Sequence, residues 1–186
     1  MKCLNLKQTT IVLISMNLRE AILAEHSKMN TQKIVQWIGN DPKKIRKLID
    51  ILLKDEHRVV QRATWIMSDV AKIHPDLMRE YIPILVKKLK DTKAHIAVKR
   101  HIYRVLQFVE LPEAIHGDLM NDCFESLMNP REALAVRAFA MGILARLVKT
   151  YPEIGNELRI IIEDALQHEA AASFKSKAKY VLNQLR

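Results

Sequence analysis

One stretch of the sequence places charged and aromatic side chains at intervals that bring them to one face of a helix. Counting from Arg58, such residues recur at steps of four, three, four and three, at Arg62, Trp65, Asp69 and Lys72. Residues at this spacing share one side of an α-helix. Cationic side chains with an aromatic residue among them are the combination that phosphate backbones and stacked bases use. The stretch therefore indicates a binding surface, with nucleic acid as one candidate ligand.

Two ordinary explanations compete with that interpretation. Lysines and arginines on an exposed helix face often do no more than keep a protein soluble. Trp65 could equally fill a gap against a neighbouring helix, because tryptophan is usually largely buried. Trp37, which stands beside Ile34 and Ile38, is expected to belong to the core.

The rest of the sequence gives little sign of catalysis. The four glycines are isolated, so no glycine-rich loop is present to hold phosphate. Cys3 and Cys123 match no metal-binding spacing, and the histidines form no HExxH motif. The sequence predicts no metal and no cofactor, and it favours a binding protein over an enzyme. The two unpaired cysteines fit a reducing, cytoplasmic setting.

The net charge of +9 is concentrated in the middle of the chain. Residues 43–104 contain 16 Lys or Arg against 7 Asp or Glu, whereas the residues before them carry +2 and those after them −2. An asymmetry of this size suggests an acidic partner such as nucleic acid. No apolar run approaches the ~20 residues that span a bilayer, so no membrane partner is expected.

The composition predicts an all-α fold. Leu, Ile, Ala, Lys, Arg and Glu dominate, with only four glycines and six prolines, which is typical of helices. Prolines are expected at helix starts, among them Pro42, Pro75 and Pro130. Residues 1–15 are expected to be a poorly ordered extension or a misplaced start, and residues 16–186 to form a single repeat domain.

Alternate predicted helices are similar to one another in sequence. Residues 59–76 match residues 136–153 at an offset of 77. The matches include one pair of valines, one pair of alanines and one pair of isoleucines. Residues 98–109 and 174–185 supply two further copies, so the period is 37 to 39 residues. A helix pair repeated at this period is typical of helical solenoids, in which one pair buries its apolar face only when neighbours stack on it.

The pattern in these copies resembles the second helix of HEAT repeats. It consists of a valine, a basic residue, a small residue four positions after the valine, and then two large aliphatic residues. The resemblance covers roughly residues 40–186 as four helix pairs, with residues 17–39 as a degenerate cap. It implies a right-handed α-α superhelix, an armadillo-type solenoid whose second helices line the concave side. HEAT arrays are mostly binding scaffolds, so the resemblance implies a protein or other macromolecular partner.

The resemblance implies that the stripe counted from Arg58 has equivalents on the second helix of each later helix pair. Equivalent positions would line one groove that is basic and contains aromatic residues. These positions are Arg58, Arg62, Trp65, Asp69, Lys72, His101, Arg104, Phe108, Phe139, Arg146, Lys149, Lys177 and Tyr180.

Three of these residues support a sharper alternative. Trp65 and Asp69, with Arg104 on the next second helix, are similar to groove residues of the HEAT-like DNA alkylation-repair glycosylases. The resemblance implies that Trp65 would contact a cationic base, Asp69 would stabilise the cationic sugar and Arg104 would hold phosphate. A further aromatic residue of that family would fall near Gly142 or Ile143, where this chain has none. The sequence thus predicts a non-catalytic binding scaffold, with a DNA-binding or glycosylase-like module as the alternative.

Overall fold

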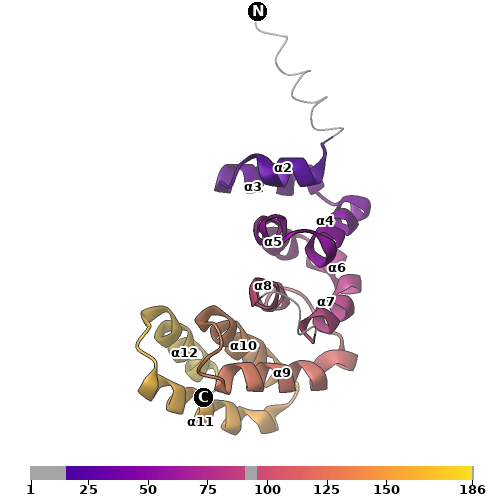
Figure 1. Ribbon diagram of the computed structural model, residues 1–186. Helices are drawn as coiled ribbons and strands as arrows, with labels where there is room; N and C mark the ends of the chain where they lie inside the picture. The colour runs from indigo at the N-terminus through magenta and orange to yellow at the C-terminus, as the bar shows by residue number, and fades with distance from the viewer. Residues whose placement is uncertain (1–15, 91–95, 186) are drawn as a thin grey trace, which may run out of the picture. The chain divides into compact units, whose positions relative to one another are not determined.

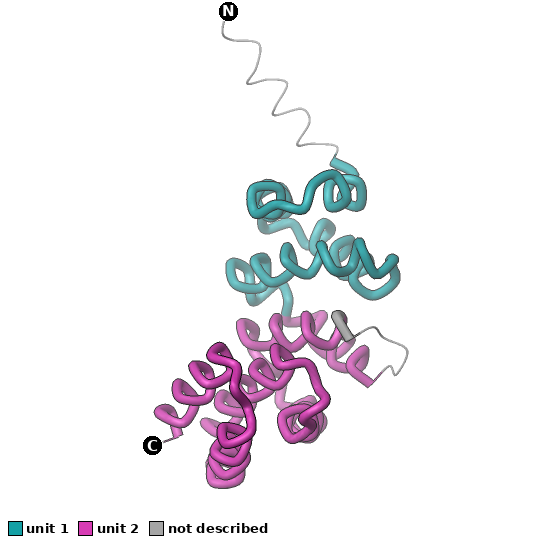
Figure 2. Tube along the Cα trace, turned by 60° about the vertical axis from the view of Figure 1, so that its left-hand side comes forward, with its two compact units in different colours: residues 1–78 teal, residues 79–186 magenta. Residues whose placement is uncertain are grey.

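The computed structural model describes residues 16–90 and 96–185, and no β-strand occurs within these two ranges. The chain divides into two compact units, residues 1–78 and residues 79–186 (Figure 2). The predicted extension, residues 1–15, lies outside the described residues, and the prediction of one repeat domain over residues 16–186 stays a prediction.

The first unit is built from two helix pairs and one short helix (Figure 1). In chain order these helices are α2 (Leu18–Ala24), α3 (Lys28–Ile38), α4 (Pro42–Lys54), α5 (His57–Ile73) and α6 (Pro75–Met78). Helix α5 contacts all of the other four, so it is the central helix of this unit.

Polar side chains begin the first three helices of this unit. Asn17, Ser27 and Asp41 each accept a hydrogen bond from a backbone amide of the following turn, at 3.4, 3.1 and 2.9 Å. These bonds satisfy amide groups that have no acceptor inside the helix. Pro42 occupies the first turn of α4, as predicted, where an amide hydrogen would have no helical acceptor.

The second unit consists of two layers of helices (Figures 1 and 2). One layer is formed by α8 (Ile96–Leu106), α10 (Leu134–Leu147) and α12 (Ala172–Gln184), with α10 in contact with both others. The other layer contains α9 (His116–Met128) and α11 (Gly155–His168), which pack against α10, while α7 (Ile82–Leu89) packs against α8. Short 3-10 turns precede the helices α7, α9 and α11, at Arg79–Tyr81, Glu113–Ile115 and Pro152–Ile154.

Equivalent residues of the predicted repeat are buried alike. Val59 and Val136 are fully buried, and so are Ala63 and Ala140. An apolar stripe at this spacing faces the neighbouring helices and forms the core. Further members of the same stripe, all at most 2% exposed, are Ile66, Ile143, Ile102, Phe174 and Ala178. The predicted all-α fold of repeated helix pairs is therefore confirmed.

The structure corrects the prediction of one helix start. The sequence predicts that Pro130 opens a helix, but α10 begins at Leu134, and residues 129–133 form a turn. The Asn129 side chain accepts a hydrogen bond from the Arg131 amide at 2.9 Å. Asparagine side chains favour such turns because they bond to the backbone two residues ahead.

Within the described ranges, no helix combines the length and the apolar character that crossing a membrane requires.

Candidate functional site

On helix α5 of the first unit, the predicted stripe presents cations and an aromatic ring to solvent. Trp65 is 48% exposed, and its ring meets that of His26 edge-on, with 6.2 Å between the ring centroids. Arg58 and Lys72 are also exposed. An exposed tryptophan between cations can contact a partner, whereas a buried one could not.

The three residues behind the glycosylase-like alternative are divided between the two units. Trp65 and Asp69 lie on α5 of the first unit, and Arg104 lies on α8 of the second. The Asp69 carboxylate lies 3.8 Å from the Lys72 amine, and the Asp69 side chain is 39% exposed. A catalytic role for Asp69 stays a prediction.

In the second unit, the predicted groove residues differ in burial. Phe108 and Tyr180 are exposed, whereas His101 is only 6% exposed. His101 directly precedes the buried Ile102 and lies one turn before the buried Val105, so its ring belongs to the interior and not to the predicted groove. Of the others, Lys149 is exposed, and the half-buried ones are Arg104, Phe139, Arg146 and Lys177.

Several arginines dock onto backbone carbonyls at the ends of neighbouring helices. Arg62 donates to two carbonyls in the last turn of α2, at 3.3 and 2.8 Å, and Arg146 to two carbonyls where α8 ends, at 2.5 and 2.7 Å. Arg137 and Arg159 reach the ends of α9 and α12 in the same way. The last carbonyls of a helix lack helical partners and carry the negative end of its dipole. Arg62 and Arg146 therefore join helices, a role that the sequence analysis missed.

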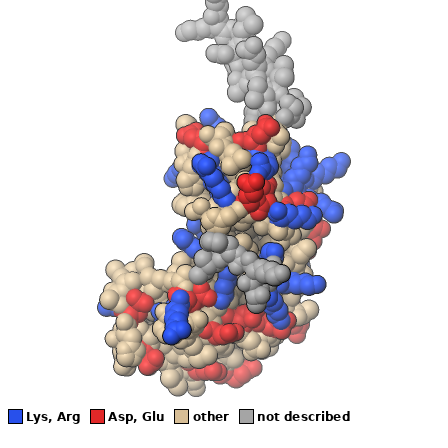
Figure 3. Space-filling model, in the orientation of Figure 1, with Lys and Arg blue, Asp and Glu red and all other residues tan. Residues whose placement is uncertain are grey.

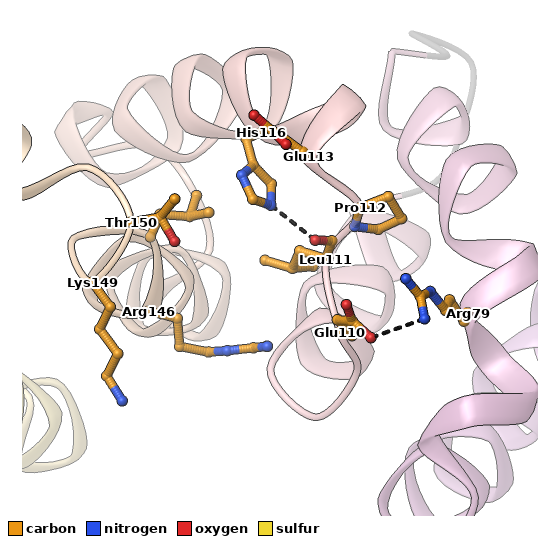
Figure 4. A pocket seen from close by; sticks show the side chains of 10 residues that line it. Arg79, Glu110, Leu111, Pro112, Glu113, His116, Arg146, Lys149 and Thr150 are labelled. Atoms are coloured by element: carbon orange, nitrogen blue, oxygen red, sulfur yellow. Dashed lines mark hydrogen bonds and ion pairs between the residues drawn. The ribbon is translucent and has the colours of Figure 1, made fainter.

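A cavity of about 660 Å³ opens beside Arg146, at the ends of α8 and α10 (Figure 4). At one side of it Arg79 and Glu110 form an ion pair at 3.2 Å. His116 donates from Nε2 to the carbonyl of Leu111 at 2.9 Å, and its Nδ1 lies 3.2 Å from the Tyr151 hydroxyl. These contacts join the segments that surround the cavity.

Charge is unevenly divided among the helices of the second unit, in which α7 also carries Lys87 and Lys88 and no acidic residue. Helices α8, α10 and α12 together contain eight Lys or Arg and no Asp or Glu, whereas α9 and α11 contain six Asp or Glu and one arginine. Figure 3 shows acidic side chains along the lower edge of this unit, where α9 and α11 lie. The charge of −2 for residues 105–186 conceals this separation, because that range sums α10 and α12 with α9 and α11 and leaves out the three cations of α8. The acid-free layer, defined as α8, α10 and α12, is therefore a basic surface that the sequence analysis underestimated.

Two cations of the acid-free layer are already neutralised within the fold. Lys99 pairs with Glu132 at 2.6 Å, and Arg137 pairs with Glu169 at 3.0 Å. Both glutamates lie outside the three helices, in the segments that precede α10 and α12.

The first unit does not sort its charges in this way. Helix α4 carries five Lys or Arg together with Asp50, and Figure 3 shows basic side chains gathered at the edge of the unit where α4 lies. The basic excess of residues 43–104 thus lies on the first helix of the α4–α5 pair as well as on the second.

Gly142 allows the Lys177 side chain to cross the surface of α10. A β-carbon at position 142 would lie 2.9 Å from both Cε and Nζ of Lys177, and 3.2 Å from Oε1 of Gln107. The lysine amine lies 5.3 Å from the centre of the Tyr180 ring. Burial lowers the pKa of the Lys177 amine. The sequence signal for this arrangement was an isolated glycine inside an apolar helical pattern.

The described cysteine and histidine residues show no metal-binding arrangement. Among the described residues, no group of three His, Cys, Asp or Glu side chains could hold a metal ion. Cys123 is buried and free, and burial raises the pKa of its thiol, so it is protonated and shielded. Cys3 lies outside the described residues.

Comparison with known families identifies the repeat. A family model described as a HEAT repeat domain matches residues 18–185, from the first residue of α2 to the end of α12. None of the curated proteins and none of the solved structures matches the chain. The family match includes α2 and α3, the helices predicted to be a degenerate cap. The chain therefore belongs to the HEAT repeat domain family.

Proposed function

We propose that the protein is a binding scaffold whose acid-free layer receives an acidic segment of a protein partner. Repeat arrays of this kind use extended surfaces for binding. The observation that carries the proposal is that three adjacent helices contain eight Lys or Arg and no Asp or Glu. Such a surface attracts carboxylates and disfavours partners that are themselves basic.

The state of the individual cations favours a protein segment over nucleic acid. Nucleic-acid binding neutralises many phosphates in series. In the acid-free layer, however, Lys99 and Arg137 pair with glutamates, and Arg146 donates to backbone carbonyls. The exposed rings of Phe108 and Tyr180 offer contacts for apolar side chains between the acidic ones.

The α5 face supplies a second contact surface of the same kind. Trp65 is exposed there, with the exposed cations Arg58 and Lys72 on the same helix. Asp69 is the one carboxylate of the predicted stripe, and it lies next to Lys72. We assign this face to the same acidic class of partner.

The test is titration of the full chain with two labelled peptides. The acidic probe peptide contains only Glu, Leu and Gly, and the neutral control peptide has Gln in place of every Glu. We expect binding of the acidic probe peptide and about tenfold weaker binding of the control, because charge pairs with the layer are lost. Equal affinities, or no binding of the acidic probe peptide, would overturn the proposal.

A duplex oligonucleotide provides the competing probe. Each phosphate that a protein neutralises releases counterions, so nucleic-acid affinity falls steeply as salt rises. If the duplex binds more tightly than the acidic probe peptide at physiological salt, with a steep salt dependence, the partner is a nucleic acid and the proposal is wrong.

A further inference from the structure

We propose that Lys177 anchors the acidic partner on the acid-free layer. Its amine binds one carboxylate of the partner in the space above Gly142, which we call the notch. This inference rests on the proposed function, because it names the contact by which the acidic segment is held.

The notch is formed by residues from three neighbouring segments. Lys177 reaches from α12 across Gly142 on α10, toward Gln107 in the turn that follows α8. The β-carbon of any other residue at position 142 would come within 2.9 Å of the lysine Nζ and Cε. Distances below about 3 Å essentially never occur for real β-carbons, so Lys177 could not keep this position beside a larger residue. Gly142 therefore leaves the space in which the Lys177 amine lies over α10, the middle helix of the acid-free layer.

Lys177 has no acidic partner in the part of the chain that the structure describes. Among the described residues, no carboxylate forms an ion pair with it, whereas Lys99 and Arg137 in the same layer each pair with a glutamate. Burial lowers the pKa of the Lys177 amine, because desolvation disfavours the ammonium form. A carboxylate placed beside the amine would favour that form again.

Neighbouring polar groups suit a carboxylate. The Tyr180 hydroxyl accepts a hydrogen bond from the Gln184 amide at 3.1 Å, which leaves its own proton available to an outside acceptor. Tyr180 is 58% exposed and lies on the same helix as Lys177, one turn further on. The Gln107 atom that faces position 142 is Oε1, an acceptor, so the donors for a carboxylate are the Lys177 amine and the Tyr180 hydroxyl. An ammonium with a hydroxyl donor on the same helix suits a carboxylate.

Substitution of three lysines on α12 tests the anchor. Lys177→Met removes the half-buried amine, while Lys175→Met and Lys179→Met remove exposed ones and change the net charge equally. We expect Lys177→Met to weaken binding of the acidic probe peptide about tenfold, and each control about twofold or less, because a partly desolvated pair contributes more than an exposed one.

Gly142→Ala supplies a second variant that changes no charge. Alanine favours a helix over glycine, and the added methyl group meets only the ends of two flexible side chains, displacing that of Lys177 and crowding Oε1 of Gln107. We therefore expect the melting temperature to be maintained and the peptide affinity to fall. Unchanged affinity of Gly142→Ala would contradict the inference.

A spectroscopic readout is independent of affinity. The pH titration of the Lys177 Cε resonance, followed by NMR in the labelled full chain, should move to higher pH when the acidic probe peptide is bound. An unmoved titration, or equal effects of all three lysine variants on affinity, would overturn the anchor while leaving the proposed function standing. Failure of the wild-type chain to bind the peptide would overturn the proposed function first.

Discussion

Replacing Arg146 by methionine separates a structural arginine from a binding one. In the structure, Nη1 and Nη2 of Arg146 donate to the carbonyls of Leu106 and Val109 at 2.5 and 2.7 Å. Methionine keeps much of the side-chain volume and helix propensity but removes both donors. If Arg146 joins the helices, the variant loses stability; if it serves only to attract a partner, stability is unchanged.

The expected loss follows from the two hydrogen bonds. Each bond from a charged donor contributes about 1.5–3 kcal/mol. Removing a half-buried cation also relieves the desolvation that lowers the pKa of Arg146, and this offsets part of the loss. We therefore expect a net loss of about 2–3 kcal/mol in the free energy of unfolding, near the lower end of the sum of the two bonds.

Urea denaturation followed by far-UV circular dichroism measures this loss. Lys149→Met is the matched control, because Lys149 lies three residues further on and is exposed. A surface substitution of this kind changes stability by about 0.5 kcal/mol or less. If Arg146→Met loses no more than Lys149→Met, the docking of Arg146 does not stabilise the fold and the reasoning is refuted.

Three further predictions concern single residues of the fold. Burial raises the pKa of Asp122. Its carboxyl group therefore contributes stability at pH values below the ordinary aspartate pKa, and this contribution is lost as the pH rises through the raised pKa of Asp122. Asp122→Asn should therefore be more stable than wild type in urea at pH 7, with the advantage shrinking in acid; equal stability at pH 7 would contradict this. A hydrogen bond from Arg19 lowers the pKa of Asp55. The Asp55 carboxylate therefore stabilises the fold at pH values above the ordinary aspartate pKa, and this stabilisation is lost as the pH falls through the lowered pKa. Arg19→Gln should reduce stability at pH 7 by a small amount, because the pair is partly exposed, and a loss that persists in acid would refute this assignment. Ile66→Ala and Ile143→Ala create cavities at equivalent buried positions and should each lose about 2–5 kcal/mol in urea unfolding; a negligible loss in either would contradict the equivalence of the repeats.

The core of the repeat could be predicted because its signal is local and periodic. Val59 and Val136 recur at the same place in a 3.6-residue pattern, and burial of an apolar stripe follows from that pattern. The cap at Asp41 and the first-turn Pro42 are signals of the same local kind. Asn129 and Pro130 carry a similar signal, but they belong to a turn, and α10 begins only at Leu134.

The roles of polar side chains could not be predicted in the same way. Arg62 and Arg146 bond to backbone carbonyls some 40 residues away, and a carbonyl has no sequence signature. Helical spacing also does not show how a helix is rotated about its own axis relative to its neighbours. His101 was therefore predicted to lie on the surface, although its ring is buried. The separation of charge was visible only once the helices were assigned to layers, because α9 and α11 alternate with the acid-free helices along the chain.

The most direct test of the account is to map the contact surface of the acidic probe peptide by NMR. Backbone amide shifts of the labelled full chain would be followed during the titration. We expect the largest shifts in the second unit to fall on α8, α10 and α12 and to centre on Gly142 and Lys177. Shifts that fall mainly on α9 and α11, or that are the same with the neutral control peptide, would contradict it.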